Sequence, residues 1–389
     1  MRIFNRIFVV FFLAVLTLSG GAAEVRRTLL AEDATQGWEL PANVRMAGSE
    51  FMIPAGSGGE VLSPRFSLPK PRQEMMIGFE FRTSPEFEPG NWKMYVEVVW
   101  LDASGRVLGR HHQHPWFVFP APALNGKWLP FHRPVTAECA PENAVAARLR
   151  FSCSGKGGKG SLTVRKVTFD SFYRLRGGSF ANWFEPGEPI VFRGTLPPDV
   201  ERIRGVVTAS DGTAVAERTV ARKEFEQNGW SCRLTRPGFY AVRFFYEKAS
   251  GESVPVVQEY YAQRINGNRL VEERKFERDF QNFVVTATKA RPVDQVPPQL
   301  GISLAPRDVA LPYRLGSNIA DEFRMRRLIG YHFMRLHALS WDEIEKSPGV
   351  YDWSTADKMF ETAAKNGIPQ SRIDAVLLDT PRFYTSRPE

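Results

Sequence analysis

Cysteine is scarce in this chain of 389 residues, and its scarcity argues against a disulfide-stabilised scaffold. The three cysteines, Cys139, Cys153 and Cys232, make an odd count, so they cannot all pair within one chain. A bridge between Cys139 and Cys153 is conceivable. However, residues 141–143 form a turn signal, and a hairpin about it would place Cys139 near Val145 instead. We therefore predict three ordinary thiols, mostly buried, and no disulfide framework.

Long apolar runs are also missing, apart from one at the N-terminus. Residues 7–18 are apolar, with Arg2 and Arg6 before them and the small residues 21–23 after them. This run is shorter than the ~20 residues that a membrane-spanning helix needs, and its flanks are those of a secretory signal. We therefore expect residues 1–23 to be a cleaved signal peptide. The mature chain should be secreted or periplasmic, with no membrane anchor.

A concentrated basic surface is missing as well, although the formal net charge is +8. The basic residues are scattered, and a short cluster at residues 324–327 falls on a predicted helix. Proteins that bind nucleic acid carry a basic stripe, often interleaved with aromatic residues that stack on bases. We therefore predict a solvated basic surface and no nucleic-acid partner.

What the sequence does contain, over most of its length, is short strand-like segments separated by turn signals. In residues 24–176 the strand candidates are 74–83, 92–101, 107–111, 144–152 and 161–169, and residues 93–100 alternate between two faces. Short strands with long loops favour a β-sandwich of jelly-roll type. This order resembles the sandwich modules that precede catalytic domains in carbohydrate-active enzymes.

A second β unit is predicted over residues 180–263. Its strand candidates are 189–192, 203–210, 214–220, 230–234, 238–246 and 254–261, with a hairpin signal at Asp211-Gly212. We interpret it as an immunoglobulin-like sandwich without the inter-sheet disulfide. The charged residues 264–298 are interpreted as a linker.

The last segment, residues 299–389, changes to alternating strands and helices. Strands are predicted at 299–305, 333–340 and 373–380, and helices at 318–330 and 354–367. Such alternation predicts βαβ units and a parallel sheet. A (β/α)8 TIM barrel takes ~250 residues, so we expect an incomplete barrel with its first three strands.

Spaced residues on this segment resemble the start of the barrel of clan A glycoside hydrolases. They are Arg335-Leu336-His337, Trp341, Ile344-Glu345, the run Gly349 to Ser354, Asp357 and Gly367-Ile368. The first motif is most similar to family 39, the xylosidase and iduronidase group. Thr380 to Phe383 and Ser386 to Pro388 are similar to that family's loop after the third strand, where Phe383 replaces a more usual Trp.

The resemblance implies a sugar site at the carboxyl ends of the strands. Side chains alternate along a strand, so Arg335 and His337 share one face and would point into the barrel. In the resembling family this arginine supports the nucleophilic glutamate and the histidine contacts the sugar. A purely bracing role for Arg335 is the alternative, since a buried arginine needs a carboxylate partner.

Three further residues complete the predicted substrate-binding set. The resemblance makes Trp341 a wall of the pocket. Asp379 could bond a sugar hydroxyl or merely cap the loop, and Phe383 could form a platform against a sugar ring. We expect Trp353 to pack as core beneath a helix and Glu345 to be structural.

No catalytic residue is assigned. Retaining glycoside hydrolysis needs two carboxylates, ~5–5.5 Å apart, and in clan A they come from strands four and seven. No Asn-Glu pair follows Phe383. The chain as it stands is therefore expected to be inactive, and no cofactor is expected.

Two other groups of residues have a plain structural interpretation. The histidines of the run His111 to Pro115 permit a metal site, but nothing indicates converging ligands, so we predict no metal. Nearby aromatic residues could stack on sugar, although core packing is favoured. They are Trp116, Phe117, Phe119 and Trp128.

The leading hypothesis is the N-terminal part of an exported glycoside hydrolase that hydrolyses O-glycosidic bonds of poly- or oligosaccharides. The rival hypothesis is a secreted carbohydrate-binding or structural β-sandwich protein with a relic barrel fragment. The coding frame after Glu389 separates them, because the enzyme needs a downstream Asn-Glu and a second strand-end Glu.

Overall fold

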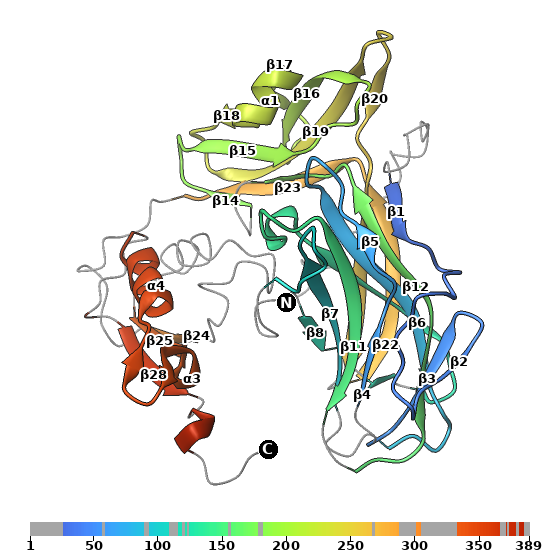
Figure 1. Cartoon of the computed structure of the whole chain (residues 1–389). Coiled ribbons are helices and arrows are strands. Elements are labelled where there is room, and N and C mark those ends of the chain that lie inside the picture. The colour runs from blue at the N-terminus through green and yellow to red at the C-terminus, as the bar shows by residue number, and fades with distance from the viewer. Residues whose placement is uncertain are drawn as a thin grey trace, which may run out of the picture.

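The computed structural model describes residues 26–56, 59–88, 93–108, 116–118, 121–122, 124–154, 157–177, 182–266, 269–287, 301–304, 333–365, 371, 373–378 and 381–384. These residues are mostly in strands (Figure 1). No helix among them is long and apolar enough to cross a membrane. The predicted signal peptide and the helix predicted at 318–330 lie outside the described residues.

The first unit is built from two β-sheets. One sheet has six strands: β2 (Arg45–Ala47), β3 (Glu50–Pro54), β12 (Ser161–Phe172), β6 (Glu74–Thr83), β10 (Leu129–Val135) and β1 (Arg26–Leu30), which pairs with β12. The other has five: β4 (Gly59–Leu62), β5 (Phe66–Ser67), β11 (Ala146–Ser154), β7 (Lys93–Leu101) and β8 (Trp116–Val118). A short 3-10 helix, η3 (Ala137–Cys139), follows β10.

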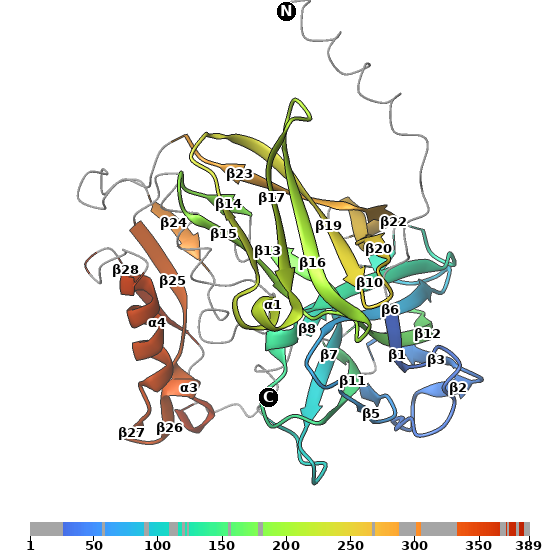
Figure 2. The same ribbon diagram turned by 90° about the horizontal axis from the view of Figure 1, so that it is seen from above.

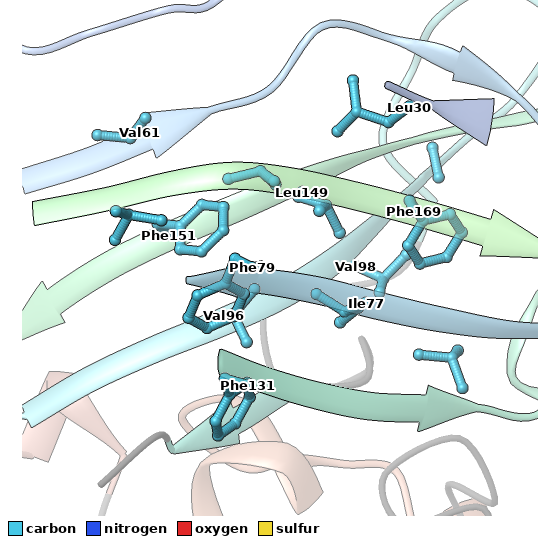
Figure 3. Close-up of a cluster of buried hydrophobic side chains, with 14 of the residues drawn as sticks. Leu30, Val61, Ile77, Phe79, Val96, Val98, Phe131, Leu149, Phe151 and Phe169 are labelled. Carbon is cyan, nitrogen blue, oxygen red and sulfur yellow. The ribbon is translucent and has the colours of Figure 1, made fainter. Parts of the chain in front are cut away.

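Alternating apolar residues of both sheets form one shared core. Figure 3 shows side chains such as Phe79 and Phe131 from the six-stranded sheet meeting Val96 and Phe151 from the other. Phe79 and Phe131 have ring centroids 4.9 Å apart, and Phe79 meets Phe151 edge-on at 5.3 Å. The two-residue period of β7 predicted which of its faces enters this core. Its opposite face, with Glu97 and Val99, is buried as well.

The second unit also has two sheets. A three-stranded sheet contains β13 (Leu175–Gly177), β15 (Pro189–Gly194) and β18 (Trp230–Arg233). A six-stranded sheet contains β14 (Trp183–Phe184), β23 (Phe280–Val285), β19 (Gly238–Lys248), β16 (Val200–Ala209), β17 (Ala214–Ala221) and β20 (Ser253–Pro255). The helix α1 (Arg222–Asn228) was not predicted, and it places Phe225 in the core.

Trp230 and Tyr240 organise the core between these two sheets. The indole Nε1 of Trp230 donates to the Arg218 carbonyl at 2.8 Å, and its ring lies over Gly205, where a Cβ would come within 2.4 Å of it. The Tyr240 hydroxyl donates to the Arg236 carbonyl at 2.6 Å. A tyrosine bonded back to the backbone at the start of such a strand is a feature of immunoglobulin-type sandwiches. The prediction of sandwich-like β-sheets is thus confirmed.

The interpretation of residues 264–298 as a linker is wrong for residues 269–285. Strands β21 (Gln258–Asn266) and β22 (Arg269–Arg278) form a hairpin, and β23 joins the second unit's larger sheet. Strand β22 was not predicted because it is strongly charged and largely exposed. Its sequence therefore lacks the apolar period that identifies a strand.

This hairpin lies between two strands of the second unit in sequence but packs on the first unit (Figure 1). Strand β22 pairs in parallel with β9 (Ala121–Pro122), and Leu270 is fully buried in the first core. Glu273 accepts the His132 backbone N–H at 2.9 Å and lies 2.6 Å from Nδ1 of the same residue. Tyr261 stacks on the His132 ring with centroids 3.9 Å apart. We call β21–β22 the clamp hairpin.

Glu273 contributes a charge to this contact. Burial raises the pKa of Glu273, but hydrogen bonds from His132 and Gln263 outweigh that effect and hold its pKa below the usual range. A carboxyl with a lowered pKa stabilises the folded state above its unfolded pKa, and this stabilisation is lost as pH falls through the folded pKa. Glu273 is therefore ionised at neutral pH and accepts the hydrogen bonds from His132 and Gln263 there.

The C-terminal segment contains a three-stranded parallel sheet, ordered β24 (Gly301–Leu304), β25 (Phe333–Ser340) and β28 (Ile373–Leu378). Helix α3 (Trp341–Ile344) follows β25 directly, and then come β26 (Glu345–Ser347), β27 (Val350–Tyr351) and α4 (Ser354–Lys365). The 3-10 helix η6 (Arg382–Tyr384) lies beyond β28. Figure 2 shows α4 beside β25 and β28. The incomplete TIM barrel expected for this segment remains a prediction.

The thiols Cys139 and Cys232 form no disulfide. Burial raises the pKa of Cys232 to about 11, although Arg218 opposes the shift. This thiol therefore stays protonated at neutral pH. The Cys153 side chain lies outside the described residues.

Candidate functional site

A buried carboxylate, Glu345, organises the surface at the carboxyl ends of β25 and β28. Its side chain is 1% exposed. Its oxygens accept the Trp341 indole N–H at 2.7 Å, the Gly349 backbone N–H at 2.8 Å and the Tyr384 hydroxyl at 2.8 Å. Because Trp341 follows β25 and Tyr384 follows β28, this carboxylate joins the ends of two strands.

These bonds determine the charge of Glu345. Burial raises its pKa, but the bonds from Gly349, Tyr384, Trp341 and Tyr351 prevail and lower the pKa below its usual range. The same contact with Glu345 raises the pKa of Tyr384. Glu345 is therefore ionised at neutral pH with protein donors on both oxygens. It can position the side chains around it, but it is not poised to donate a proton.

The side chains around Glu345 form an exposed aromatic cluster. Its members are Trp341, Tyr351, Trp353, Phe383 and Tyr384. Tyr351 is 52%, Trp353 49% and Tyr384 51% exposed. Tyr351 and Trp353 lie nearly parallel, at 21° with centroids 6.2 Å apart. Trp341 and Tyr384 are 5.6 Å apart, and Phe383 meets Tyr384 at 4.7 Å.

This position in the fold suits a binding site. In parallel α/β folds the carboxyl ends of the strands carry the site, because the loops that follow them converge there. Large aromatic side chains are more often buried than half exposed, so several together on one surface indicate a ligand or a partner. The cluster is the strongest candidate for a functional site in the described part of the segment.

The structure brings together two of the five predicted site residues. Trp341 is partly buried beside Tyr384, and Phe383 is 43% exposed. Arg335 lies in β25, paired in the ladder with Ser303 and Asp374. The side chains of Arg335 and His337, and the whole of Asp379, lie outside the described residues, so their predicted roles remain predictions.

Sequence reasoning missed three members of the cluster. Trp353 was expected in the core, and this expectation is wrong, since nearly half of its surface is exposed. The helical apolar period begins only at Ser354, so Tyr351 and Trp353 precede the helix rather than pack beneath it. Tyr384 carried no sequence signal, because its partner Glu345 is 39 residues away.

Replacing Glu345 with glutamine should loosen the aromatic cluster. The amide would direct two N–H donors at groups that are themselves donors, so at least one bond to Glu345 would be lost. We expect Glu345→Gln to increase acrylamide quenching of tryptophan fluorescence while the main unfolding transition stays in place. Glu361→Gln is the control, because Glu361 on α4 is 66% exposed and pairs with the exposed Lys365. Equal quenching in both variants would contradict an organising role for Glu345.

No group of three metal-ligand side chains occurs among the described residues. The histidines at 111, 112 and 114 lie outside them. So do Phe119 and the side chains of Trp116 and Phe117. Trp128 is described, and it lies partly exposed near two arginines rather than in the core.

Comparison with known proteins gives partial likenesses only. No family model matches the sequence, and no curated protein matches it. Solved structures similar to parts of the chain include carbohydrate-binding domains and a glycoside hydrolase domain, at low identity and partial coverage.

Three of these structures illustrate the range. The Emp47p carbohydrate recognition domain is 7% identical with a TM-score of 0.27, over 37% of this chain and 94% of that one. The CBM22-1 xylan-binding domain of Paenibacillus barcinonensis Xyn10C is 13% identical with a TM-score of 0.25. The match covers 39% of this chain and 97% of that domain. The Endo-D glycoside hydrolase domain from Streptococcus pneumoniae R6 is 8% identical with a TM-score of 0.22. The match covers 65% of this chain and 37% of that one. At TM-scores this low, the likenesses assign neither a family nor a function to the chain.

Proposed function

We propose that this chain binds poly- or oligosaccharide through the aromatic cluster around Glu345, as the N-terminal part of an exported glycoside hydrolase. Such an enzyme would hydrolyse O-glycosidic bonds by a retaining mechanism with two carboxylates. The observation that carries the proposal is the half-exposed aromatic surface at the carboxyl ends of two parallel strands. The residue pattern shared with clan A glycoside hydrolases supports it.

The chemistry of the cluster fits a sugar. A sugar ring has an apolar face that can stack on an aromatic ring, and hydroxyls that bond to polar groups at the ring's edge. Tyr and Trp provide large contact areas with few rotatable bonds, so little entropy is lost when they are held in place. Here Glu345 fixes Trp341, Tyr351 and Tyr384, which prepares the surface before a ligand arrives.

A second candidate function is glycan binding by the β-sandwiches, in which the aromatic cluster does not contact the glycan. It is favoured by the partly exposed Trp128 on the outer face of the first unit. Both functions predict retention by polysaccharides, and they differ in the residues that cause it. Substitution in the cluster therefore separates them.

Trp353→Ala should weaken binding of the full chain to a neutral polysaccharide by about tenfold. Loss of one stacked ring costs about 1.4 kcal/mol in this estimate, which corresponds to that factor. Affinity gel electrophoresis against soluble xylan, mannan and β-glucan measures it. Phe239→Ala is the matched control, because Phe239 is 72% exposed on the second unit and is not a member of the cluster.

The expected result is a loss with Trp353→Ala and none with Phe239→Ala. If both variants are retained as well as the parent chain, the cluster is not the binding surface. If the parent chain is retained by no polysaccharide in the panel, the proposed function itself fails.

A further inference from the structure

The outer face of the six-stranded sheet carries a second unusual surface, centred on Trp128. This residue lies just before β10, and two arginines approach its indole ring. The guanidinium carbon of Arg165 is 3.8 Å and that of Arg82 is 4.5 Å from the ring centroid. Both distances are within the range of a cation–π contact. Trp128 is thus half-buried and in contact with two cations.

The cations near Trp128 outnumber the acidic partners that neutralise them. Glu80 accepts from Arg165 Nε at 2.7 Å and from Lys166 Nζ at 3.0 Å. Arg165 also lies 3.5 Å from Glu50. Arg82 has no carboxylate within ion-pair distance among the described residues. We call these residues, with Trp128, the Trp128 patch.

A backbone irregularity brings the cations together. The register of β12 against β6 shifts between Arg165 and Thr168, which marks a β-bulge. Lys166 within it has a φ of 50°, a left-handed conformation that non-glycine residues seldom adopt. Because of the bulge, the consecutive residues Arg165 and Lys166 both reach Glu80. Bulges and strained residues of this kind recur where a side chain is directed at a ligand.

The patch continues across the sheet as an open row. In the strand register Arg82 lies opposite Thr163, Thr163 opposite Met52, and Met52 opposite Arg45. These side chains are partly or fully exposed. Neighbouring strands are ~4.8 Å apart, so the row spans about 14 Å from Arg82 to Arg45. It is long enough for an extended ligand rather than a single ion.

We propose that the Trp128 patch binds a hexuronate unit of an acidic glycan, with Arg82, which lies against the Trp128 ring, pairing with its carboxylate. This inference rests on the proposed carbohydrate function and names a substrate class for a second site. A guanidinium pairs with a carboxylate through two parallel hydrogen bonds, which makes Arg82 a selective partner. Glu80 and Glu50 in the same patch would repel a densely charged polyanion, so well-spaced carboxylates fit better than a nucleic acid.

The test measures binding of the full chain to tetragalacturonate, with xylotetraose as the neutral probe and a sulfated dextran oligosaccharide as the sulfate probe. Isothermal titration calorimetry should show the tightest binding for tetragalacturonate. Arg82→Ala should weaken that binding about tenfold or more, as expected for loss of a charge-assisted pair. Raising the salt from 50 to 500 mM should weaken it as well, because exposed charges are screened.

Arg27→Ala is the matched control, since Arg27 is an exposed arginine of the same sheet with the same charge. The proposal predicts a change below twofold in this variant. Equal losses in Arg82→Ala and Arg27→Ala would show a general charge effect and overturn it. So would tighter binding of the sulfated probe than of tetragalacturonate.

Lys166→Gly separates binding from folding. Glycine adopts a φ of 50° without steric strain, so this variant should unfold at a urea concentration close to that of the parent chain yet bind tetragalacturonate more weakly. Unchanged tetragalacturonate binding would assign Lys166 a purely structural role and count against the proposal. If neutral glycan binding that depends on Trp353 persists while the uronate result fails, this inference falls and the proposed function stands.

Discussion

Leu270→Ala is expected to lower the free energy of unfolding by about 2–5 kcal/mol, the usual cost of removing a fully buried leucine side chain. Leu270 belongs to the clamp hairpin, which is inserted in the sequence of the second unit, but its side chain is fully buried in the core of the first. A cavity there would weaken the first core and release the hairpin from it. Urea unfolding measures the loss, and limited proteolysis should cut between residues 258 and 278 first.

Ile265→Ala is the matched control on the same hairpin, because Ile265 is 46% exposed. We expect it to change the stability by less than about 0.5 kcal/mol, as for most surface substitutions. If Leu270→Ala were as mild as this control, the hairpin would lie on the first unit without anchoring it.

Gly205→Ala should be nearly as damaging, at about 3 kcal/mol. The new Cβ would lie 2.4 to 2.7 Å from three atoms of the Trp230 indole, closer than real contacts allow. Trp230 is fully buried, and its N–H is bonded to the Arg218 carbonyl, so the ring has little room to move. Overpacking of a dense core usually costs 1–3 kcal/mol and occasionally more.

Gly238→Ala provides the control, since a Cβ there would meet Tyr240 at an ordinary 3.5 Å. We expect it to have little effect on the urea midpoint. Combining Gly205→Ala with Trp230→Leu should cost less than the sum of the two single changes, because the second removes the atoms that the first would strike. A simple sum would mean that the close approach of Gly205 to Trp230 does not limit the packing.

The parts of the fold that the sequence predicted are those with a local period. In strand β7 the apolar residues Met94, Val96 and Val98 recur at a period of two, and spacing alone therefore identified the face that enters the main core. Strand β22 lacks that signal because it is strongly charged and buries little besides Leu270. Its place depends on contacts with β9 and β10, which are far away in sequence, and local reasoning therefore interpreted it as a linker.

The candidate site likewise contains residues that the sequence indicated and residues that it did not. The likeness to a known barrel pointed to Trp341 and Phe383, which lie in the aromatic cluster. Glu345, which organises the cluster, is recognisable only when Tyr384 and Gly349 are seen to donate to it. A carboxylate in a sequence does not show whether it faces water or four donors. The exposure of Trp353 likewise depends on what the rest of the fold leaves uncovered.

Hydroxyl-radical footprinting with and without a saturating polysaccharide tests the central claim most directly. The probe is the neutral polysaccharide that retains the parent chain most strongly. Oxidation of Tyr351, Trp353 and Phe383 should fall at least severalfold when it is bound, while oxidation of Phe239 should stay constant. Binding that leaves the oxidation of all three cluster residues unchanged would contradict the claim that the aromatic cluster is the carbohydrate site.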